Sequence, residues 1–370
     1  TTLYHLIFIV KIKIIMKVSI LGNGLTSLTL AQTLANQGIK IDIFSNQKIK
    51  DNNKIQTLGI SKSNIDFFND NILDIEKLLW KINKIEIYSD NLIDEKILNF
   101  ENSEENLFSI VKNYDLYSAL ISSLKKNKLF KIKQHYKKIK LDDYKLIINC
   151  DFNSHLSKKF FFREHNKDYN SRAFTGIIYH EKFKNNNTAV QIFTKKGPLA
   201  FLPISSEQTS IVYSIRSPNN ISFLDLIKKY NKNYKIIKID QISNFELKGK
   251  ILRNYHYKNV LAFGDLLHKL HPLAGQGYNM SIRDIQFLLK LIRFKQSLGL
   301  DLDSSICFEF EKKLKHKNYL FSSGIDFVYE FFNLESKINN PLISKSVKFL
   351  GQNKYINKVF TKFADDGLAI

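Results

Sequence analysis

The residues that could do chemistry are concentrated in one stretch, Asn259 to Asp284. Within it, Val260 to Phe263 is a short apolar run of the right length for a buried strand, and Gly264-Asp265 follows at once. This order places the Asp265 carboxylate at the carboxyl edge of a sheet, where open α/β sheets bind ligands. Gly275-Gln276-Gly277 then leaves backbone amides uncovered at a helix start, which favours a ligand that carries or develops negative charge.

Two histidines lie between these features. His271 precedes Pro272, and the pair bends the chain, because proline fixes its own φ and restricts the residue before it. His268 and His271 are three residues apart, but the sequence offers no third metal ligand beside them. We therefore expect packing and hydrogen bonding within the loop rather than a metal site.

The elements that must position this stretch include a β–α–β unit at the start of the chain. Lys17 to Leu21 and Ile39 to Phe44 are predicted strands, and the helix between them ends near Gly38. The turn Gly22-Asn23-Gly24 joins the first strand to this helix, and its glycines allow a pyrophosphate to approach the helix N-terminus. The pattern predicts a dinucleotide-binding site at Gly22, Asn23 and Gly24.

Composition indicates a globular protein of one large or two interleaved domains, since the chain has 370 residues and 44% of them are hydrophobic. The net charge of +21 comes from scattered lysines, and arginine is scarce, so nucleic acid is not an expected partner. The positive charge does predict attraction to an anionic membrane surface. Cys150 and Cys307 show no paired or metal-like spacing and fit a reducing cytosol.

No apolar run is long enough to predict a membrane-spanning helix. Leu3 to Ile15 is apolar but is interrupted by His5, Lys11 and Lys13. Because Met16 stands directly before the first strand, we expect residues 1–15 to be an upstream extension. A short segment that touches a membrane is the alternative.

Asn259 to Asp284 resembles the second flavin-binding motif of class A FAD-dependent aromatic monooxygenases, in the form found in ubiquinone-biosynthesis hydroxylases. The matching positions are Gly264, Asp265, His268, Pro272, Gly275, Gln276, Gly277 and Asn279. The resemblance implies that FAD binds along this stretch, Tyr278 included, that Asp265 holds the ribityl hydroxyls, and that His271-Pro272 shapes the flavin edge. No side chain is expected to act as catalytic acid, base or nucleophile, since the flavin carries the chemistry. A chance strand–loop–helix is the alternative, which so many matched positions disfavour.

The sequence departs from the family pattern at Ser27, Ser45, Gln56, Phe152 and Leu266-Leu267. Ser27 replaces a third glycine, and Ser45 replaces the acid that usually holds the adenosine ribose. Gln56 replaces an arginine near the flavin, and Phe152 replaces the glycine of an Asp-Gly pair linked to FAD and NAD(P)H. Leu266-Leu267 stand where small residues are usual. We expect Ser45 and Gln56 still to contact FAD, with binding weaker than the family norm.

Thr188 to Pro203 resembles the family segment in which a Gly-Pro turn leads into a strand lining the substrate cavity. By this resemblance Phe201, Leu202 and Pro203 line an apolar pocket suited to a lipid-tailed ring. A simple β-turn within a sheet is the alternative.

The predicted fold class is α/β: a Rossmann-like FAD-binding domain interleaved with an antiparallel β-sheet substrate domain, similar to p-hydroxybenzoate hydroxylase, and a helical C-terminal tail. The expected ranges are 16–75, 104–155 and 251–300 for the FAD-binding domain, 76–103 and 156–250 for the substrate domain, and 301–370 for the tail. Predicted helices in the second half of the FAD-binding domain and in the tail are Asn106 to Leu124, Ser305 to Phe321, Gly324 to Phe332, Pro341 to Leu350 and Lys354 to Phe363.

The resemblance implies a FAD-dependent monooxygenase that uses NAD(P)H and O2 to hydroxylate the aromatic ring of a polyprenylated ubiquinone precursor. It implies a cytoplasmic protein peripheral to the inner membrane, a lipid-tailed phenol or quinone precursor as substrate, and other ubiquinone-biosynthesis proteins as partners. A scaffold protein without flavin turnover and a flavin-dependent lipid reductase of the same fold stay open as alternatives. A halogenase is disfavoured, because its Trp-x-Trp signature needs two tryptophans and Trp80 stands alone.

Overall fold

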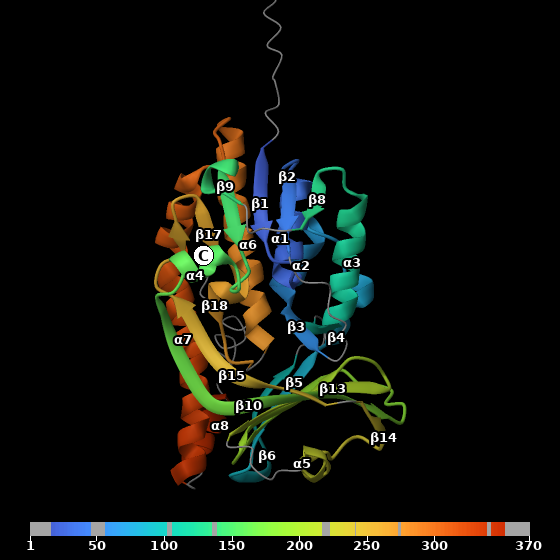
Figure 1. The fold of residues 1–370 in the computed structure, drawn as a ribbon. Coiled ribbons are helices and arrows are strands. Elements are labelled where there is room, and N and C mark those ends of the chain that lie inside the picture. Colours follow the sequence, from blue (N-terminus) through green and yellow to red (C-terminus); the bar gives the residue numbers. More distant parts are fainter. Residues whose placement is uncertain are drawn as a thin grey trace, which may run out of the picture.

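The computed structural model describes residues 16–45, 56–101, 106–134, 139–216, 223–240, 242–272, 275–338 and 342–351. The predicted extension at 1–15 and the predicted helix Lys354 to Phe363 lie outside these residues. The described chain forms two large sheets, one above the other in the view of Figure 1, with long helices beside them. This arrangement confirms the predicted α/β class.

The upper sheet has the strand order β16-β17-β9-β1-β2-β8. Its strands are β1 (Lys17–Leu21), β2 (Lys40–Phe44), β8 (Phe130–Lys133), β9 (Leu146–Asn149), β16 (His256–Tyr257) and β17 (Val260–Ala262). All neighbours pair in parallel except β16, which runs antiparallel to β17 at one edge. The β–α–β unit predicted at the start of the chain is therefore present, with β1 inside the sheet.

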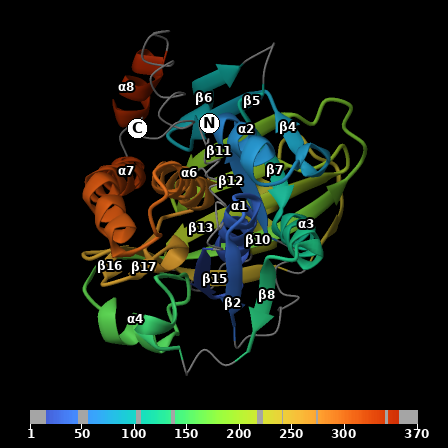
Figure 2. The same cartoon turned by 90° about the horizontal axis from the view of Figure 1, so that it is seen from above.

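Helices flank this sheet. They are α1 (Leu25–Asn36), α2 (Lys62–Asn71), α3 (Asn113–Lys126), α4 (His155–Phe160) and α6 (Gln276–Ser297), with short 3-10 helices η2 (Glu76–Leu78), η4 (Leu141–Asp143) and η5 (Gly264–Leu266). Seen from above, α1 lies between α3 and α6 (Figure 2). The start of α1 and the start of α6, which follow the two glycine turns, are thereby brought into one layer.

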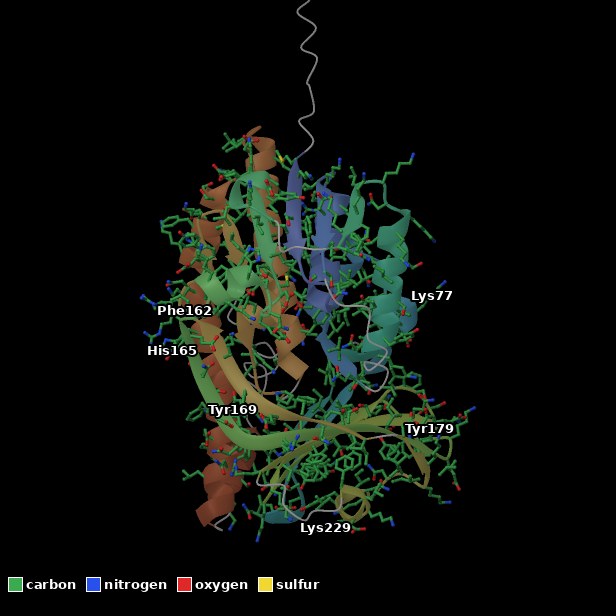
Figure 3. All side chains as sticks on the ribbon, in the orientation of Figure 1. Lys77, Phe162, His165, Tyr169, Tyr179 and Lys229 are labelled. Carbon is green, nitrogen blue, oxygen red and sulfur yellow. The ribbon has the colours of Figure 1, made fainter. Side chains whose placement is uncertain are left out.

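The lower sheet is mostly antiparallel and follows the path β18-β15-β10-β13-β12-β11-β5-β6, with β14 paired to β10. Its strands are β5 (Lys84–Ser89), β6 (Leu92–Glu101), β10 (Glu164–His180), β11 (Thr188–Thr194), β12 (Gly197–Pro203), β13 (Gln208–Arg216), β14 (Ile236–Ile239), β15 (Ser243–Leu252) and β18 (His268–Lys269). Helix α5 (Phe223–Tyr230) covers the face turned away from the upper sheet (Figure 1). The long strand β10 joins the two levels, since it passes from His165 beside the upper sheet through Tyr169 to Tyr179 in the lower one (Figure 3).

A third, small sheet of β3 (Thr57–Ser61), β7 (Phe108–Lys112) and β4 (Trp80–Ile82) lies between the large ones. The prediction of one helix over Asn106 to Leu124 is therefore wrong in its first part, because α3 begins only at Asn113. Residues 108–112 pair on one side with β3 and on the other with β4, and these ladders supply the backbone partners that a helix would otherwise provide.

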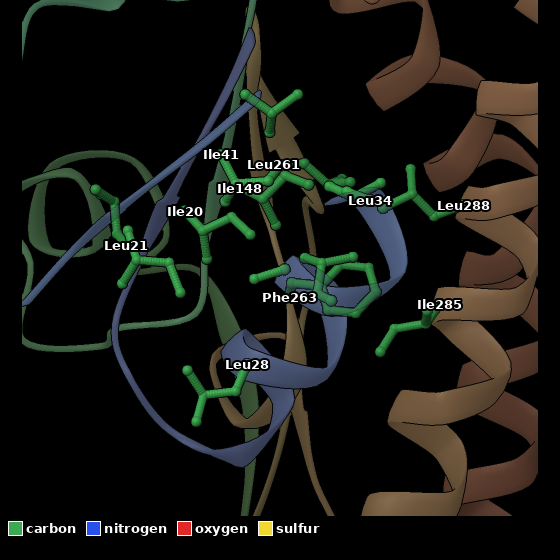
Figure 4. Packing of buried hydrophobic residues seen from close by; sticks show 14 of the residues in the cluster. Ile20, Leu21, Leu28, Leu34, Ile41, Ile148, Leu261, Phe263, Ile285 and Leu288 are labelled. Carbon is green, nitrogen blue, oxygen red and sulfur yellow. The ribbon is translucent and has the colours of Figure 1, made fainter. Parts of the chain in front are cut away.

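The apolar positions expected to be buried form one core between the upper sheet and its helices (Figure 4). Leu28 and Leu34 of α1 and Ile285 of α6 meet Ile20 of β1 and Phe263 at the end of β17, all of them fully or almost fully buried. Burial of Phe263 anchors the strand end, so Gly264-Asp265 must emerge at the carboxyl edge of the sheet, as predicted.

The C-terminal part is helical, as predicted, but α7 (Ser304–Ile338) is one continuous helix and α8 (Leu342–Gly351) follows it. The predicted interruption before Gly324 is wrong. One glycine costs a helix only about 1 kcal/mol, and the buried side chains of Phe321 and Ile325 continue the same stripe across it. Helix α7 runs beside both large sheets (Figure 1). Among the described helices, none is both long and apolar enough to cross a bilayer.

Candidate cofactor-binding site

The two glycine turns meet at the carboxyl edge of the upper sheet. Gly264 has φ +61°, and a Cβ placed on it would lie 3.0 Å from Cγ2 of Thr26 in the first turn of α1. Gly22 has φ +102°, and a Cβ there would lie 3.3 Å from Oγ of Ser27 and 3.4 Å from Cβ of Asp151. Both positions thus require glycine for its backbone conformation and for the close approach. The predicted convergence of the two motifs is present.

Two helices begin at this edge with no side-chain cap from the described residues. Gly24 is the N-cap of α1 and Gly275 that of α6, and neither helix has a side-chain cap. A Cβ added at Gly24 or Gly277 would meet no atom of the described residues within 4 Å. Asn23 lies half-buried beside Gly24, and the carbonyl of Pro272 accepts a hydrogen bond of 3.2 Å from the Gly275 amide. Uncovered amides at helix starts suit anionic groups, so these residues fit a dinucleotide pyrophosphate and an electron-rich ring.

A carboxylate and a thiol lie deep between the two turns. The Asp265 side chain is open to solvent on one side, yet protein surrounds it on the others. This enclosure raises the pKa of its carboxyl, against the opposing attraction of Lys269 and His268. Burial likewise raises the pKa of the Cys150 thiol to about 12, so Cys150 is neutral at physiological pH. The Asp265 carboxyl is suited to hydrogen-bond ligand hydroxyls.

The side chains of Tyr278 and Asn279 are used within the protein. The Tyr278 hydroxyl lies 2.7 Å from Oγ1 of Thr29 and joins α6 to α1. Nδ2 of Asn279 donates to the Gly59 carbonyl at 2.8 Å, and its Oδ1 accepts from the Ser61 amide at 3.0 Å. These bonds fix the start of α6 against β3, so contact of these two residues with a ligand falls to their backbone amides.

The two histidines of the motif take structural positions. Nε2 of His268 lies 2.5 Å from Oδ2 of Asp284 on α6, and both side chains are buried. The His271 ring packs edge-on to Tyr169, with ring centroids 4.8 Å apart, and 4.3 Å from the ring of Tyr329 on α7. Burial, with added repulsion from nearby cations, lowers the pKa of His271 to about 3, so its imidazole is neutral.

The departures from the family pattern differ in where their side chains lie. Ser27 is buried beneath the Gly22 turn, where the structure has room for a small side chain. Phe152 is 56% exposed on the surface, and Leu266 and Leu267 point into the core between sheet and helices. The two leucines therefore do not cover Asp265, whereas Phe152 follows Asp151, which lies against the Gly22 turn.

Ser45 and Gln56 flank the cleft through their backbones. The Ser45 amide donates to the Lys133 carbonyl at 3.3 Å, and the Gln56 carbonyl accepts from the Asn113 amide at 2.9 Å. Gln276 is buried at the first turn of α6. Contacts of these three side chains with FAD stay predictions.

The structure separates the three residues predicted to line the substrate pocket. Phe201 belongs to the core under α5, on the face turned away from the cofactor cleft, whereas Leu202 packs on the opposite face with Ile177 and Ala189. Adjacent residues of a strand point to opposite faces, so Phe201 and Leu202 cannot line one pocket together. The role of Leu202 stays a prediction, whereas Pro203 lies on the same face as Phe201 by this alternation, and Phe201 supports the sheet from behind.

Sequence reasoning missed several residues that shape the site. Thr26 lies against Gly264, and Gly59 lies against Gly275. Asp284 holds the His268 ring, and Tyr169 and Tyr329 pack against the His271 ring. Only Asp284 carried a signal, since it lies on the stretch already singled out. The others come from segments far away in the chain.

Comparisons with known proteins define the class. Residues 226–294 match the family of FAD binding domains. The fold is similar to that of p-nitrophenol 4-monooxygenase PnpA from Pseudomonas putida DLL-E4, with a TM-score of 0.77 at 12% identity over 96% of this chain and 99% of that one. It is also similar to Klebsiella pneumoniae HpxO complexed with FAD and uric acid, with a TM-score of 0.72 at 12% identity over 95% and 97%. The chain thus has the fold of the FAD-dependent monooxygenases and a segment that matches an FAD binding domain, and its cofactor is FAD.

Sequence relatives define the group within that class. Ubiquinone biosynthesis monooxygenase COQ6 of Dictyostelium discoideum is 22% identical over 90% of this chain and 87% of its own length. The 3-demethoxyubiquinol 3-hydroxylase of Escherichia coli is 28% identical over 39% of each protein, so that match spans less than half of either chain. The resemblance to the ubiquinone-biosynthesis hydroxylases is thereby confirmed.

Proposed function

We propose that this protein hydroxylates the aromatic ring of a polyprenylated ubiquinone precursor, using FAD, NAD(P)H and O2. The observation that carries the proposal is the meeting of Gly22 and Gly264 beside Asp265, with the uncovered starts of α1 and α6 on either side. This arrangement offers amides for a pyrophosphate and a carboxylate for ribityl hydroxyls. The relatives named above supply the substrate class.

Bound FAD supplies transfer of electrons from NAD(P)H to O2 and insertion of one oxygen atom into an electron-rich ring. The amides at Gly277 and Tyr278 stabilise negative charge at the start of α6. Asp265 orients the ribityl chain, and the N-terminal amides of α1 hold the pyrophosphate. The lower sheet closes the cleft and keeps water from the reacting ring.

The lower sheet supports an apolar substrate. Its upper face carries buried Ile177 and Ala189 and partly buried Leu202, which pack against Ile82 and Ile110 of the small sheet. The partly buried members of this cluster, Leu202 among them, give this side of the sheet an apolar character that a prenyl tail would match. We further propose that the protein works at a membrane surface, where its substrate is dissolved, together with other ubiquinone-biosynthesis proteins.

Purification followed by turnover tests this proposal. We expect a yellow protein that oxidises NAD(P)H faster when a prenylated phenol is added, and mass spectrometry should find an oxygen atom from 18O2 in the product. Oxidation of NAD(P)H with reduction of the lipid and no incorporated oxygen would favour the lipid reductase. A colourless protein that rejects added FAD, yet binds ubiquinone-biosynthesis enzymes, would favour the scaffold.

A further inference from the structure

Exposed aromatic rings and cations alternate on one side of the molecule, over α4, β16 and the first half of α7. We call this surface the aromatic–basic face. Its rings are Phe162, Tyr257, Phe308 and Tyr319, and its cations are Lys159, Arg163, Lys258 and Lys312. The four rings are 63%, 40%, 55% and 50% exposed, although large apolar side chains are normally withdrawn from water.

The rings belong to one continuous surface. Phe160 at the end of α4 stacks on Tyr257, with ring centroids 3.9 Å apart. From β16 the surface passes to α7, since His256 lies 6.4 Å from the ring of Phe308. Further along α7, Tyr319 lies 6.2 Å from His165, which Figure 3 shows on the same side of the molecule as Phe162. Three segments far apart in the chain therefore present their rings together.

A cation covers the ring at each of several points. Nζ of Lys312 lies 5.8 Å from the ring centre of Phe308, and the guanidinium of Arg163 lies 5.9 Å from that of Phe162. Lys258 covers Tyr257 at 5.9 Å. Stacking of nucleic-acid bases uses an open ring face, and at each of these three rings a cation already lies over one face. The ring edges and the cation heads are what the surface presents outwards.

The charge of this surface is one-sided. Segments 158–165, 256–258 and 308–319 contain eight lysine or arginine residues and three glutamates. Two of the three glutamates are already paired, Glu164 with Lys250 and Glu311 with Lys315. The partner that this surface fits is therefore anionic, with an apolar layer behind the charges.

We propose that the aromatic–basic face docks on an anionic phospholipid bilayer, with its rings at the headgroup level and its cations on the lipid phosphates. Headgroups supply the negative charge and the acyl boundary accepts the ring edges. The inference rests on the proposed function in one respect, since a lipid-tailed substrate favours a lipid surface over an acidic protein.

Vesicle binding by the full chain tests the proposal. The variant Lys159→Glu/Lys258→Glu/Lys312→Glu reverses charges on the face, and Lys125→Glu/Lys128→Glu/Lys131→Glu makes the same change in net charge near β8, at the opposite edge of the upper sheet. Partition onto vesicles containing phosphatidylglycerol should fall on the order of a hundredfold for the first variant and only a few-fold for the control. Equal losses in both variants would overturn the proposal, because only the overall charge would then matter.

A second pair of variants tests the rings. Phe162→Ser/Phe308→Ser should weaken vesicle binding even at high salt, whereas Ile132→Ser/Ile237→Ser, which truncates exposed apolar residues on β8 and β14, should not. Stronger binding of the wild-type chain to a single-stranded oligonucleotide than to vesicles, lost in the face variants, would also overturn the proposal. Turnover of a short-tailed phenol without vesicles separates the two proposals: its absence in the wild type contradicts the proposed function and leaves docking standing.

Discussion

At the scale of single residues, Asp265 has opposite effects on cofactor binding and on the stability of the apoprotein. Enclosure by protein raises the pKa of its carboxyl, so the folded chain disfavours the ionised form that binds hydroxyls best. A carboxyl whose pKa is higher in the folded than in the unfolded chain makes the fold more stable at low pH than at neutral pH. That contribution is lost as pH rises through the folded pKa.

Asp265→Asn should therefore raise the melting temperature of the apoprotein at pH 7 and lower FAD affinity by on the order of ten- to a hundredfold. The difference in melting temperature should vanish below the ordinary aspartate pKa of 3.8. Thermal unfolding and fluorescence titration with FAD measure the two effects. Asp66→Asn on the exposed side of α2 is the matched control, and an FAD affinity equal to that of the wild type would contradict the assigned role.

His271 gives the protein a second pH dependence. Burial lowers its pKa from 6.5 to about 3, so the neutral ring stabilises the fold above pH 6.5 and this stabilisation is lost as pH falls towards 3. The loss should be about 1.4 kcal/mol for each pH unit in that range. His271→Phe, which keeps an aromatic ring between Tyr169 and Tyr329, should flatten this part of the curve in chemical denaturation. His155→Phe, at an exposed histidine, should leave it unchanged, and an equally steep curve for His271→Phe would show that another group is responsible.

At the scale of elements, the contact between the start of α1 and the end of β17 holds the two cofactor motifs together. Gly264→Ala introduces a Cβ at φ +61°, 3.0 Å from Thr26 Cγ2, and should destabilise the fold by about 1–3 kcal/mol. Adding Thr26→Ser removes that methyl group and should recover part of the loss. The four free energies of unfolding in this double-mutant cycle measure the coupling, and strictly additive effects would contradict the contact.

Helix α7 shows what an element contributes beyond its own stability. Tyr169 of β10 donates to Asp326 of α7 at 2.5 Å, and Ser171 lies 3.0 Å from the Tyr329 hydroxyl. The same helix side encloses His271 and so supports the loop before α6. The C-terminal helix is thus part of the frame of the cofactor cleft, although no residue of its sequence resembles a flavin motif.

At the scale of the whole molecule, local patterns predicted what depends on neighbouring residues in the chain. The strand–glycine–helix order at Gly22 and the strand end at Gly264 each contain their own turn chemistry, so both were predictable. The role of Phe201 could not be predicted. Strand alternation shows that Phe201 and Leu202 face opposite ways, but it does not show which of the two faces the cofactor site. Which face of the strand meets the cofactor site depends on where α5 and the small sheet pack. Strand β7 of the small sheet was not predicted, because Asn106 to Leu124 was interpreted as one helix.

Contacts between distant segments could not be predicted from the sequence either. The partners of Gly264 and of His271 lie far away in the chain, on α1, β10 and α7. No spacing within one segment encodes such a pair. The continuous path of α7 across Gly324 follows from packing on both large sheets, which outweighs the local preference of one residue.

The central claim is that a dinucleotide pyrophosphate lies against the open start of α1, and titration of Gly24 variants with FAD tests it most directly. Gly24 has an extended backbone, and no atom of the part of the chain that the structure describes lies within 4 Å of a Cβ there, so this part of the fold tolerates a side chain. Gly24→Asp should stabilise the apoprotein by up to about 1 kcal/mol as an N-cap, while its charge repels the pyrophosphate. Gly24→Asn has the same shape without the charge and should bind FAD more tightly than Gly24→Asp. The account predicts a single FAD bound by the wild type and little or none by Gly24→Asp; equal affinity of these two proteins would contradict it.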